Sequence, residues 1–264
     1  MFKLQDFTQF KQAKQKITML TAYDYFSAQM IEKAGINTIL VGDSLGMVVA
    51  GNPNTLSVTI DEMIYHAKAV RRGAPHSFII VDMPYLSYHI SIEETVRNAG
   101  RIIQETNANA VKIEVNHPAA FAHIEAVMAA QIPVIGHIGM TPQSVNVFGG
   151  FKTQGKKPGS ADKILDFAHQ LAQIGVTAIV LECIPAALAE TITQQISIAT
   201  IGIGSGVNCD GQVLVFYDML GFNPENKLKF VKHFANAHEH LTTGLKNYSL
   251  EVTNGTFPDE SHTY

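Results

Sequence analysis

The fold follows from the segment Thr38-Ile-Leu-Val-Gly-Asp43 and from three other segments of the same kind. These are Phe78-Ile-Ile-Val-Asp82, Ala110-Val-Lys-Ile-Glu114 and Ala178-Ile-Val-Leu-Glu182. Each is short, rich in β-branched residues and apolar on both faces, which is typical of a strand buried in a parallel sheet. A buried carboxylate at the end of such a strand is costly unless something pairs with it. One such acid could simply face water, but four at matching strand ends predict a shared site held by a cation or a substrate.

Strand-like and helix-like segments alternate along the whole chain. We predict eight strands, at 17–21, 38–42, 78–81, 110–114, 133–136, 178–182, 199–202 and 213–217. Repeated βα units with right-handed crossovers close naturally into an α/β fold of the (β/α)8 TIM-barrel type. An open doubly wound sheet is the alternative, but no Gly-x-Gly-x-x-Gly motif follows the first strand. No shift in composition marks a linker, so we expect residues 1–264 to form one barrel domain with a C-terminal helix and a polar tail.

Helix boundaries are marked by capping residues. Thr59-Ile-Asp-Glu62 and Ser91-Ile-Glu-Glu94 both match the capping box, in which a hydroxyl and a carboxylate satisfy free amides reciprocally. Pro142 and Pro185 stand where first helical turns could begin. Three glycines fall where helix C-caps are expected, namely Gly35, Gly73 and Gly175.

Composition excludes several classes of protein. The 264 residues carry a net charge of -4, from 19 basic and 23 acidic side chains, and no basic stripe predicts nucleic-acid binding. With 46% hydrophobic and 16% charged residues, the chain suits a compact protein that buries surface in an oligomer.

The two cysteines, Cys183 and Cys209, favour neither a disulfide framework nor a zinc cluster. The first seven residues lack a secretory h-region, and no apolar stretch reaches the ~20 residues of a membrane span.

Asp43 and Asp82 are candidate metal ligands. Carboxylate oxygens are hard donors, and magnesium favours one or two of them with waters and substrate oxygens. No His-x-x-x-His motif or cysteine pair offers a softer metal a better site. Alternatively, Asp43 caps the turn before Ser44, and Asp82 forms the turn before Pro84.

Lys112 and Glu114 are two residues apart in one predicted strand, so their side chains point to the same face. A lysine directed into a barrel beside carboxylates is well placed to bind an anionic group. A purely structural pair of Lys112 with Glu114 or an aspartate is the alternative. Because desolvation offsets the attraction within a buried ion pair, such pairs stabilise poorly, and this favours the functional interpretation.

Glu182 is a candidate general base. Its predicted strand holds no other charge, and removal from water makes a carboxylate more basic. Alternatively, Glu182 caps the helix at Pro185 or joins the metal ligands. His137, directly after the predicted strand at 133–136, lies at the same level as Glu182. It is either a functional group or a hydrogen-bonded core histidine.

Motifs spread from about Ile17 to the C-terminal tail resemble the ketopantoate hydroxymethyltransferase family. They are Thr21-Ala-Tyr-Asp-Tyr25, Leu40-Val-Gly-Asp-Ser-Leu-Gly-Met47, His66 with Val70-Arg-Arg-Gly-Ala-Pro75, Val111-Lys-Ile-Glu114, Gly136-His-Ile-Gly-Met-Thr-Pro-Gln143, Leu181-Glu-Cys183 and Gly202-Ile-Gly-Ser-Gly206. The motifs are long, and their order matches. About the first fifteen residues carry no such signal.

The resemblance implies a magnesium-dependent barrel of the phosphoenolpyruvate/pyruvate-binding superfamily, assembled as a homodecamer in the cytoplasm. It implies transfer of a one-carbon unit from the co-substrate 5,10-methylenetetrahydrofolate to 3-methyl-2-oxobutanoate, through a magnesium-stabilised enolate, giving 2-dehydropantoate for pantothenate biosynthesis. Position by position, it implies metal ligands at Asp43, Asp82 and Glu114. It further implies keto-acid contacts at Ser44 and Lys112 besides the metal-ligand aspartates, a pocket residue at His137 and a proton acceptor at Glu182. The folate pocket is not matched to residues.

Two other functions are compatible with the same barrel. A carbon–carbon lyase of this superfamily would resemble its relatives in a Lys-x-Cys-Gly-His loop, but Val115-Asn-His-Pro118 follows the fourth strand here, with no cysteine nearby. A non-catalytic keto-acid-binding barrel could dispense with Lys112 or Glu182, and both are present.

Overall fold

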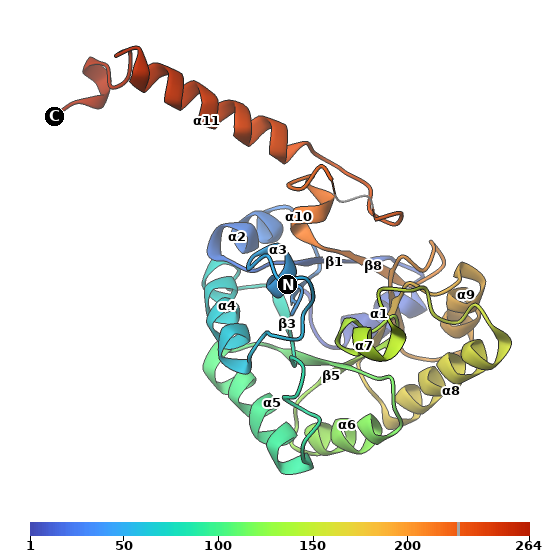
Figure 1. The fold of residues 1–264 in the computed structure, drawn as a ribbon. Helices are drawn as coiled ribbons and strands as arrows, with labels where there is room; N and C mark the ends of the chain where they lie inside the picture. The colour runs from blue at the N-terminus through green and yellow to red at the C-terminus, as the bar shows by residue number, and fades with distance from the viewer. Residues whose placement is uncertain (226–227) are drawn as a thin grey trace. The chain divides into compact units, whose positions relative to one another are not determined.

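The computed structural model describes residues 1–225 and 228–264, which form two compact units, Met1–Val215 and Phe216–Tyr264. In the first unit, eight parallel strands close into a barrel in chain order, and β1 pairs with both β2 and β8 (Figure 1). The strands are β1 (Ile17–Thr21), β2 (Thr38–Val41), β3 (Phe78–Asp82), β4 (Ala110–Glu114), β5 (Val134–Gly139), β6 (Ala178–Glu182), β7 (Ala199–Ile203) and β8 (Gly211–Leu214). The predicted barrel is confirmed.

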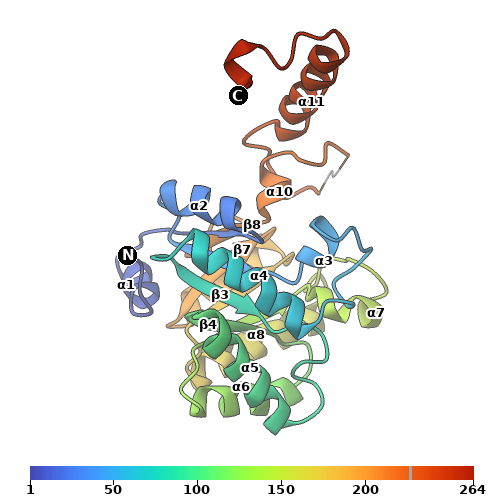
Figure 2. The ribbon, with the colours of Figure 1, turned by 90° about the vertical axis from the view of Figure 1, so that its left-hand side faces the viewer.

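Helices surround the strands, as the two views of the ribbon show (Figures 1 and 2). Those of the first unit are α1 (Asp6–Gln12), α2 (Tyr25–Lys33), α3 (Leu45–Val48), α4 (Ile60–Gly73), α5 (Ile92–Thr106), α6 (Ala119–Ala129), η1 (Pro142–Ser144), α7 (Val145–Phe148), α8 (Pro158–Ile174) and α9 (Ala186–Gln195). Helices cover the outer face of the strands, and the inner face is buried in the interior of the barrel. This is why these segments are apolar throughout instead of alternating.

The capping signals act largely as predicted. Thr59 and Glu62 form the reciprocal capping box at the start of α4. At the start of α5 the predicted box is only half formed: Ser91 Oγ accepts a hydrogen bond from Glu94 N, without the return bond from the Glu94 side chain. Asp24 and Ser27 form a further capping box at α2 that the sequence analysis did not identify. Pro185 is the N-cap of α9, whereas Pro142 begins only a short 3₁₀ turn.

The predicted C-cap glycines differ in their roles. Gly35 (φ 73°) and Gly175 (φ 89°) adopt the left-handed conformation at helix ends, as predicted. The prediction for Gly73 is wrong, because this residue is the last of α4 and Ala74 is the C-cap. A Cβ at Gly73 would lie 2.1 Å from the carbonyl oxygen of Tyr25, so its missing side chain lets α4 approach α2 closely.

The prediction for the eighth strand is wrong in its bounds. It spans Gly211–Leu214 and not 213–217, and Phe216 and Tyr217 belong to the short helix α10 (Phe216–Met219). Two consecutive aromatic residues imitate a strand. The true start depends on Gly211, where a Cβ would lie 2.4 Å from the carbonyl oxygen of Ile17 at the closure of the barrel.

Helix α1 covers the amino ends of the strands, although the segment before β1 carried no signal in the sequence. Its Phe7 is fully buried and packs edge-to-face on Phe78, the first residue of β3, with 5.5 Å between ring centroids. Lys11 Nζ donates to Asp210 Oδ2 (2.7 Å) and to the carbonyl oxygen of Thr193 (2.8 Å).

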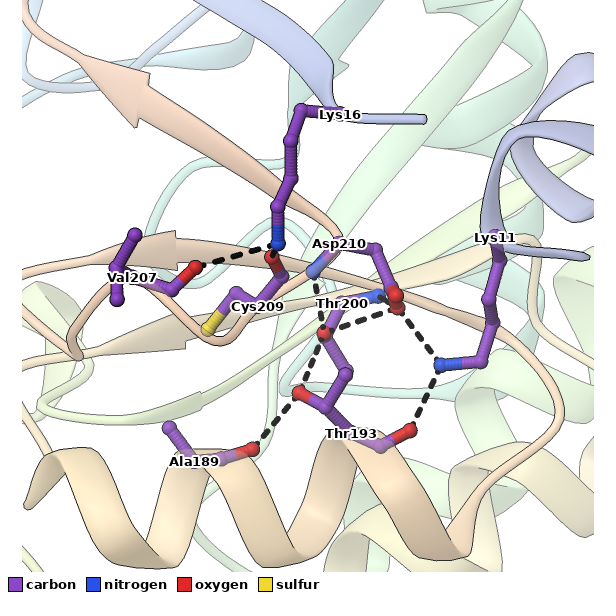
Figure 3. A network of polar contacts seen from close by, with 8 residues as sticks. All are labelled: Lys11, Lys16, Ala189, Thr193, Thr200, Val207, Cys209 and Asp210. Atoms are coloured by element: carbon purple, nitrogen blue, oxygen red, sulfur yellow. Dashed lines mark hydrogen bonds and ion pairs between the residues drawn. The ribbon is translucent and has the colours of Figure 1, made fainter. Parts of the chain in front are cut away.

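Asp210 is the centre of this polar network (Figure 3). Besides Lys11, its Oδ2 accepts hydrogen bonds from Thr200 N (2.9 Å) and Thr200 Oγ1 (3.1 Å), while Thr200 Oγ1 lies 2.8 Å from Thr193 Oγ1. The network joins α1, α9, β7 and the residue before β8. It therefore fastens the amino end of the barrel, where barrel residues serve stability more than catalysis.

The second unit contains α10, α11 (Ala237–Thr253) and the 3₁₀ helix η2 (Glu260–His262). Backbone hydrogen bonds tie Phe234 N to Met219 O and Ala237 N to Leu220 O. The assignment of both units to one domain stays a prediction. Within the described residues, no helix combines the length and apolarity that a membrane crossing requires.

The network at Asp210 can be tested against a matched surface pair. The ion pairs Lys11–Asp210 and Arg101–Asp61 are equally short, at 2.7 Å, but the exposed fractions of the aspartate side chains are 14% and 77%. We expect Asp210→Ala to lower the free energy of unfolding by about 2–3 kcal/mol, because a charged acceptor with several buried donors is lost. Asp61→Ala should cost below ~1 kcal/mol. Urea denaturation measures both, and equal losses would contradict this account.

Candidate functional site

The four predicted strand-end acids all lie at the carboxyl end of the barrel. Asp43, Asp82 and Glu114 are buried, and the side chain of Glu182 keeps 17% of its surface exposed. The strand register brings Lys112 level with Asp82. These groups come together because the carboxyl ends of parallel strands meet at one end of the barrel.

Five of the predicted residues form a continuous series of contacts, which we call the charge chain. Asp43 N donates to Asp82 Oδ2 (3.0 Å), and Asp82 Oδ1 lies 3.0 Å from Lys112 Nζ. Lys112 Nζ lies 3.1 Å from His137 Nδ1, and His137 Nε2 lies 3.1 Å from Glu182 Oε2. The charge chain thus crosses β3, β4, β5 and β6, beginning at the second residue after β2. Lys112 thus pairs with an aspartate, Asp82, which is one of the two pairings considered as a structural alternative.

The contact with Lys112 decides the tautomer of a neutral His137. In a neutral ring, Nδ1 is the acceptor and the proton lies on Nε2, because an ammonium group is only a donor. Nδ1 also lies 3.5 Å from Glu114 Oε1. Burial and the Lys112 ammonium oppose a charged ring, but the Glu114 and Glu182 carboxylates outweigh them and raise the pKa of His137. His137 Nε2 lies 3.1 Å from Glu182 Oε2, but the angles of this contact are not those of a hydrogen bond. The contact between His137 and the Glu182 carboxylate is therefore electrostatic.

The charge chain lies in an excess of buried negative charge. Burial first, and then the charges of Asp82 and Glu114, hold the pKa of Asp43 well above its usual range. Burial also raises the pKa of Asp82, although Lys112 opposes the shift. Burial disfavours the Lys112 ammonium, but the three surrounding carboxylates outweigh burial and raise its pKa above the ordinary value. Lys112 is therefore charged, and one ammonium does not balance three carboxylates.

Two carboxylate oxygens in this cluster have spare capacity for a ligand. Asp82 Oδ1 and Glu114 Oε1 are buried and have no hydrogen-bond partner within the described part of the chain. The angles of the Asp82–Lys112 contact make it an ion pair and not a hydrogen bond. Spare hard oxygens in a negatively charged pocket fit a divalent cation such as magnesium. In residues 1–225 and 228–264, no three His, Cys, Asp or Glu side chains converge closely enough to hold a metal ion by themselves. One or two carboxylates would therefore bind the ion here, and waters and substrate oxygens would complete the coordination.

The alternative capping roles find no support in these contacts. Asp43 Oδ2 accepts from the side chain of Gln143 and not from the turn at Ser44. Ser44 Oγ instead lies 2.7 Å from the hydroxyl of Tyr23, at the edge of the site. Asp82 Oδ2 accepts from Asp43 N and not from the turn at Pro84.

Gln143 is a site residue that the sequence analysis did not identify. Its Nε2 donates to Asp43 Oδ2 (2.8 Å) and to the carbonyl oxygen of Met83 (3.0 Å). Its backbone N donates to Glu114 Oε2 (3.0 Å), and its Oε1 accepts from the hydroxyl of Tyr88 (2.6 Å). Gln143 therefore holds two of the three buried carboxylates. The motif ending at Gln143 was recognised, but nothing in it predicts contacts to residues a hundred positions away.

Comparison with known proteins identifies close relatives over nearly the whole chain. The model of the ketopantoate hydroxymethyltransferase family matches residues 1–260. A 3-methyl-2-oxobutanoate hydroxymethyltransferase of Clostridium botulinum is 52% identical over 258 residues, covering 98% of this chain and 94% of its own. One of Clostridioides difficile is 51% identical over 261 residues, covering 99% and 94%.

Solved structures with the same fold are more distant in sequence. A 2,3-dimethylmalate lyase of the PEP mutase/isocitrate lyase superfamily has a TM-score of 0.62 at 12% identity, covering 99% of this chain and 91% of its own. A phosphonopyruvate hydrolase solved with oxalate and Mg²⁺ has a TM-score of 0.62 at 11% identity, covering 99% and 93%. At this identity the likeness concerns the fold alone.

The structural role of Gln143 gives a testable expectation. Gln143→Leu leaves the Asp43 carboxylate, the Met83 carbonyl and the Tyr88 hydroxyl each short of a partner. We expect the free energy of unfolding to fall by about 2–4 kcal/mol, since each buried polar group left unsatisfied costs ~1–3 kcal/mol. Gln194→Leu, on the exposed face of α9, should change it by less than ~0.5 kcal/mol. Urea denaturation compares the two, and similar effects would show that Gln143 is not holding the site.

Proposed function

The chain belongs to the ketopantoate hydroxymethyltransferase family, and on that premise we propose that it transfers a one-carbon unit from 5,10-methylenetetrahydrofolate to 3-methyl-2-oxobutanoate. It is an enzyme, a hydroxymethyltransferase of the pantothenate pathway. The observation that carries the proposal is the family match over residues 1–260. The product is 2-dehydropantoate.

The reaction is redox-neutral and consumes one water molecule. The keto acid loses its C3 proton, and C3 forms a carbon–carbon bond to the methylene carbon of the donor. Both bonds from that carbon to the folate nitrogens break: one is replaced by the carbon–carbon bond and the other by a bond to the water oxygen. Tetrahydrofolate leaves with its nitrogens protonated. The protein must therefore bind two substrates, accept one proton and keep other water away from the reactive methylene carbon.

The residues present fit magnesium, as the negative charge and the spare oxygens of the site indicate. Asp43 and Asp82 would hold the ion, with Glu114 as a further ligand. When bound, magnesium supplies Lewis-acid stabilisation of the negative charge that develops on the keto oxygen as the enolate forms. That the related phosphonopyruvate hydrolase barrel was solved with Mg²⁺ supports the same choice.

Lys112 and Ser44 are proposed to bind the keto acid. Lys112 is charged and fixed between Asp82 and His137, so its ammonium is oriented before the substrate arrives. A carboxylate substrate gains a charge-assisted hydrogen bond from such a group. The hydroxyl of Ser44, already held by Tyr23, offers a neutral hydrogen bond on the other side of the site.

Glu182 is the proposed general base, with His137 as its positioning residue. Glu182 lies at the end of the charge chain, away from Asp43 and Asp82, and its side chain is half-buried with one known partner contact, to His137. A carboxylate that is not engaged by a cation is free to accept the C3 proton. His137 Nε2, 3.1 Å from Glu182 Oε2, then orients the accepting carboxylate by electrostatic attraction.

A lyase role is not favoured. The curated relatives are hydroxymethyltransferases, and the loop that directly follows β4, Val115-Asn-His-Pro118, contains no cysteine. Cys183 does lie at the end of β6, but burial and then the neighbouring Glu182 raise the pKa of its thiol to about 12. It is therefore protonated at neutral pH and is neither a thiolate nucleophile nor a ready proton donor.

The remaining proposals concern the setting of the enzyme. We propose a homodecamer in the cytoplasm, as the family resemblance implies.

Metal dependence is the first expectation. Exhaustive chelation should abolish turnover, and added magnesium should restore it, because the buried carboxylates lack a second cation to balance them. Turnover is measured by the release of tetrahydrofolate, with metal content checked by elemental analysis. Full activity in a preparation shown to be metal-free would overturn the magnesium assignment.

The role of Glu182 can be separated from turnover. Exchange of the C3 hydrogen of 3-methyl-2-oxobutanoate in deuterated water reports proton removal without folate. Glu182→Gln is nearly isosteric and does not accept this proton, so exchange and turnover should both fall by ~10²–10⁴-fold. Calorimetric binding of keto acid and magnesium should persist. Exchange at the wild-type rate would place the base elsewhere, and loss of magnesium binding would make Glu182 a metal ligand.

A further inference from the structure

A cavity of about 390 Å³ lies beside the charge chain, and none of the proposed roles uses it. Its walls come from the segments that follow β2, β3, β4 and β5. They comprise Leu56, Tyr85, Tyr88, His89, Glu114, Asn116, His117, Ala119, Ala120, His123, Gln143, Ser144, Asn146 and Val147. Because three of these residues are histidines, we call it the histidine cavity. Its volume is within the range of small-molecule binding sites.

The histidine cavity adjoins the reaction site without being part of it. Its lining shares only Glu114 and Gln143 with the buried carboxylate cluster, and it includes no member of the charge chain. Gln143 nevertheless connects the two, since its Nε2 lies 2.8 Å from Asp43 Oδ2. A ligand in this cavity would therefore contact the same side chain that holds a proposed metal ligand. This is the position required of a second substrate that must deliver a carbon atom to the first.

The lining suits a neutral, flat molecule. Tyr85 and His89 provide aromatic surface. Tyr88, only 3% exposed, supports His89 from within, since their rings lie 4.1 Å apart at 34°. Among the described lining residues, Glu114 carries a negative charge and no lysine or arginine is present. An anionic ligand would find no counter-charge here, whereas a planar heterocycle would find rings to stack on.

The hydrogen bonds of two imidazoles define what they offer to a ligand. His89 Nδ1 accepts from Leu86 N (3.2 Å), and His117 Nδ1 accepts from Ala119 N (3.2 Å). In the neutral ring, each therefore carries its proton on Nε2. Burial lowers the pKa of His89, which keeps that ring neutral. The cavity thus presents N–H donors together with the side-chain amides of Asn116 and Asn146.

A transition metal is not the occupant that these histidines indicate. In the part of the chain that the structure describes, no three His, Cys, Asp or Glu side chains converge on one point. His123 Nδ1 is already engaged with Thr95 Oγ1 at 2.7 Å. The imidazoles are spread over the wall of the cavity, as they would be around an extended ligand.

We propose that the histidine cavity binds the reduced pteridine ring of the one-carbon donor. This rests on the proposed function, which requires such a donor, and it assigns the donor to particular residues. The pyrimidinone ring of a reduced pteridine is flat, and the bicycle is uncharged at neutral pH and rich in amide-type acceptors and donors. These properties match the stacking surface, the imidazole N–H groups and the amides. Bound there, the ring presents its methylene carbon next to Gln143 and Glu114, toward the keto acid at the strand ends.

A large side chain introduced at one position of α6 would fill the cavity, and the same side chain at a second position of α6 would not. Ala120 lines it, whereas Ala122 is exposed on the same helix outside the lining. Ala120→Phe should weaken the binding of tetrahydrofolate at least about tenfold in calorimetry, because the ring and the new side chain compete for the same space. Ala122→Phe should bind it as the wild type does. Both variants should exchange the C3 hydrogen of the keto acid at the wild-type rate, since that step needs no folate.

A tryptophan introduced at the mouth of the cavity gives a second test, which leaves the interior of the cavity open. The chain contains no tryptophan, so an introduced indole is its only one. Val147, which lines the cavity, and Val207, near the amino end of the barrel, have exposed fractions of 78% and 77%. Tetrahydrofolate should change the emission of the Val147→Trp variant along the same saturation curve as in calorimetry. It should leave that of the Val207→Trp variant unchanged.

The outcomes separate the cavity assignment from the proposed reaction. If the wild type binds tetrahydrofolate and Ala120→Phe binds it equally well, the cavity is not the donor site, although the reaction stands. If tetrahydrofolate does not change the emission of the Val147→Trp variant, the assignment is overturned as well, even if Ala120→Phe fails to fold. If the wild type binds no tetrahydrofolate and turns over no methylenetetrahydrofolate, the cavity assignment and the proposed function both fail.

Discussion

The burial of like charges at one end of the barrel is the constraint on which the site depends. Asp43, Asp82 and Glu114 are removed from water, and the Lys112 ammonium lies 3.0 Å from Asp82 Oδ1. Such an arrangement is costly, and replacing it with apolar side chains would in general be neutral or stabilising. Its presence therefore points to a ligand that repays the cost. A divalent cation and an α-keto acid together supply a positive charge and a chelating group that suit it.

The two ends of the barrel share the tasks of stability and chemistry. At the amino end, α1, Lys11 and Asp210 close the structure with contacts that are fully satisfied within the protein. At the carboxyl end, buried oxygens of Asp82 and Glu114 have no hydrogen-bond partner within the described residues. The charge chain also gives direction to the site, since it runs from the proposed metal ligands at one side to the proposed base, Glu182, at the other.

Much of this could be predicted from the sequence, because strands buried on both faces have a distinctive composition. The apolar segments ending at Asp43, Asp82, Glu114 and Glu182 located the strand ends, and closure of the sheet then brought their acids together. What escaped prediction depends on contacts between distant segments. Gln143 is one polar residue in a loop, and its role exists only because Asp43 and Tyr88 fold against it. Likewise, Gly73 matched a C-cap pattern, yet its function is the close approach of α4 to Tyr25.

The central claim is that the strand-end carboxylates hold a divalent cation that binds the keto acid. Its most direct test is a crystal structure with Mn²⁺ in place of Mg²⁺ and with 3-methyl-2-oxobutanoate bound, since both ions prefer oxygen ligands and anomalous scattering locates manganese. The account predicts an anomalous peak within coordination distance of the Asp43 and Asp82 carboxylates. The keto acid should lie on the ion, with its carboxylate hydrogen-bonded to Lys112. A keto acid bound in the barrel with no peak at these carboxylates, or a peak elsewhere, would contradict it.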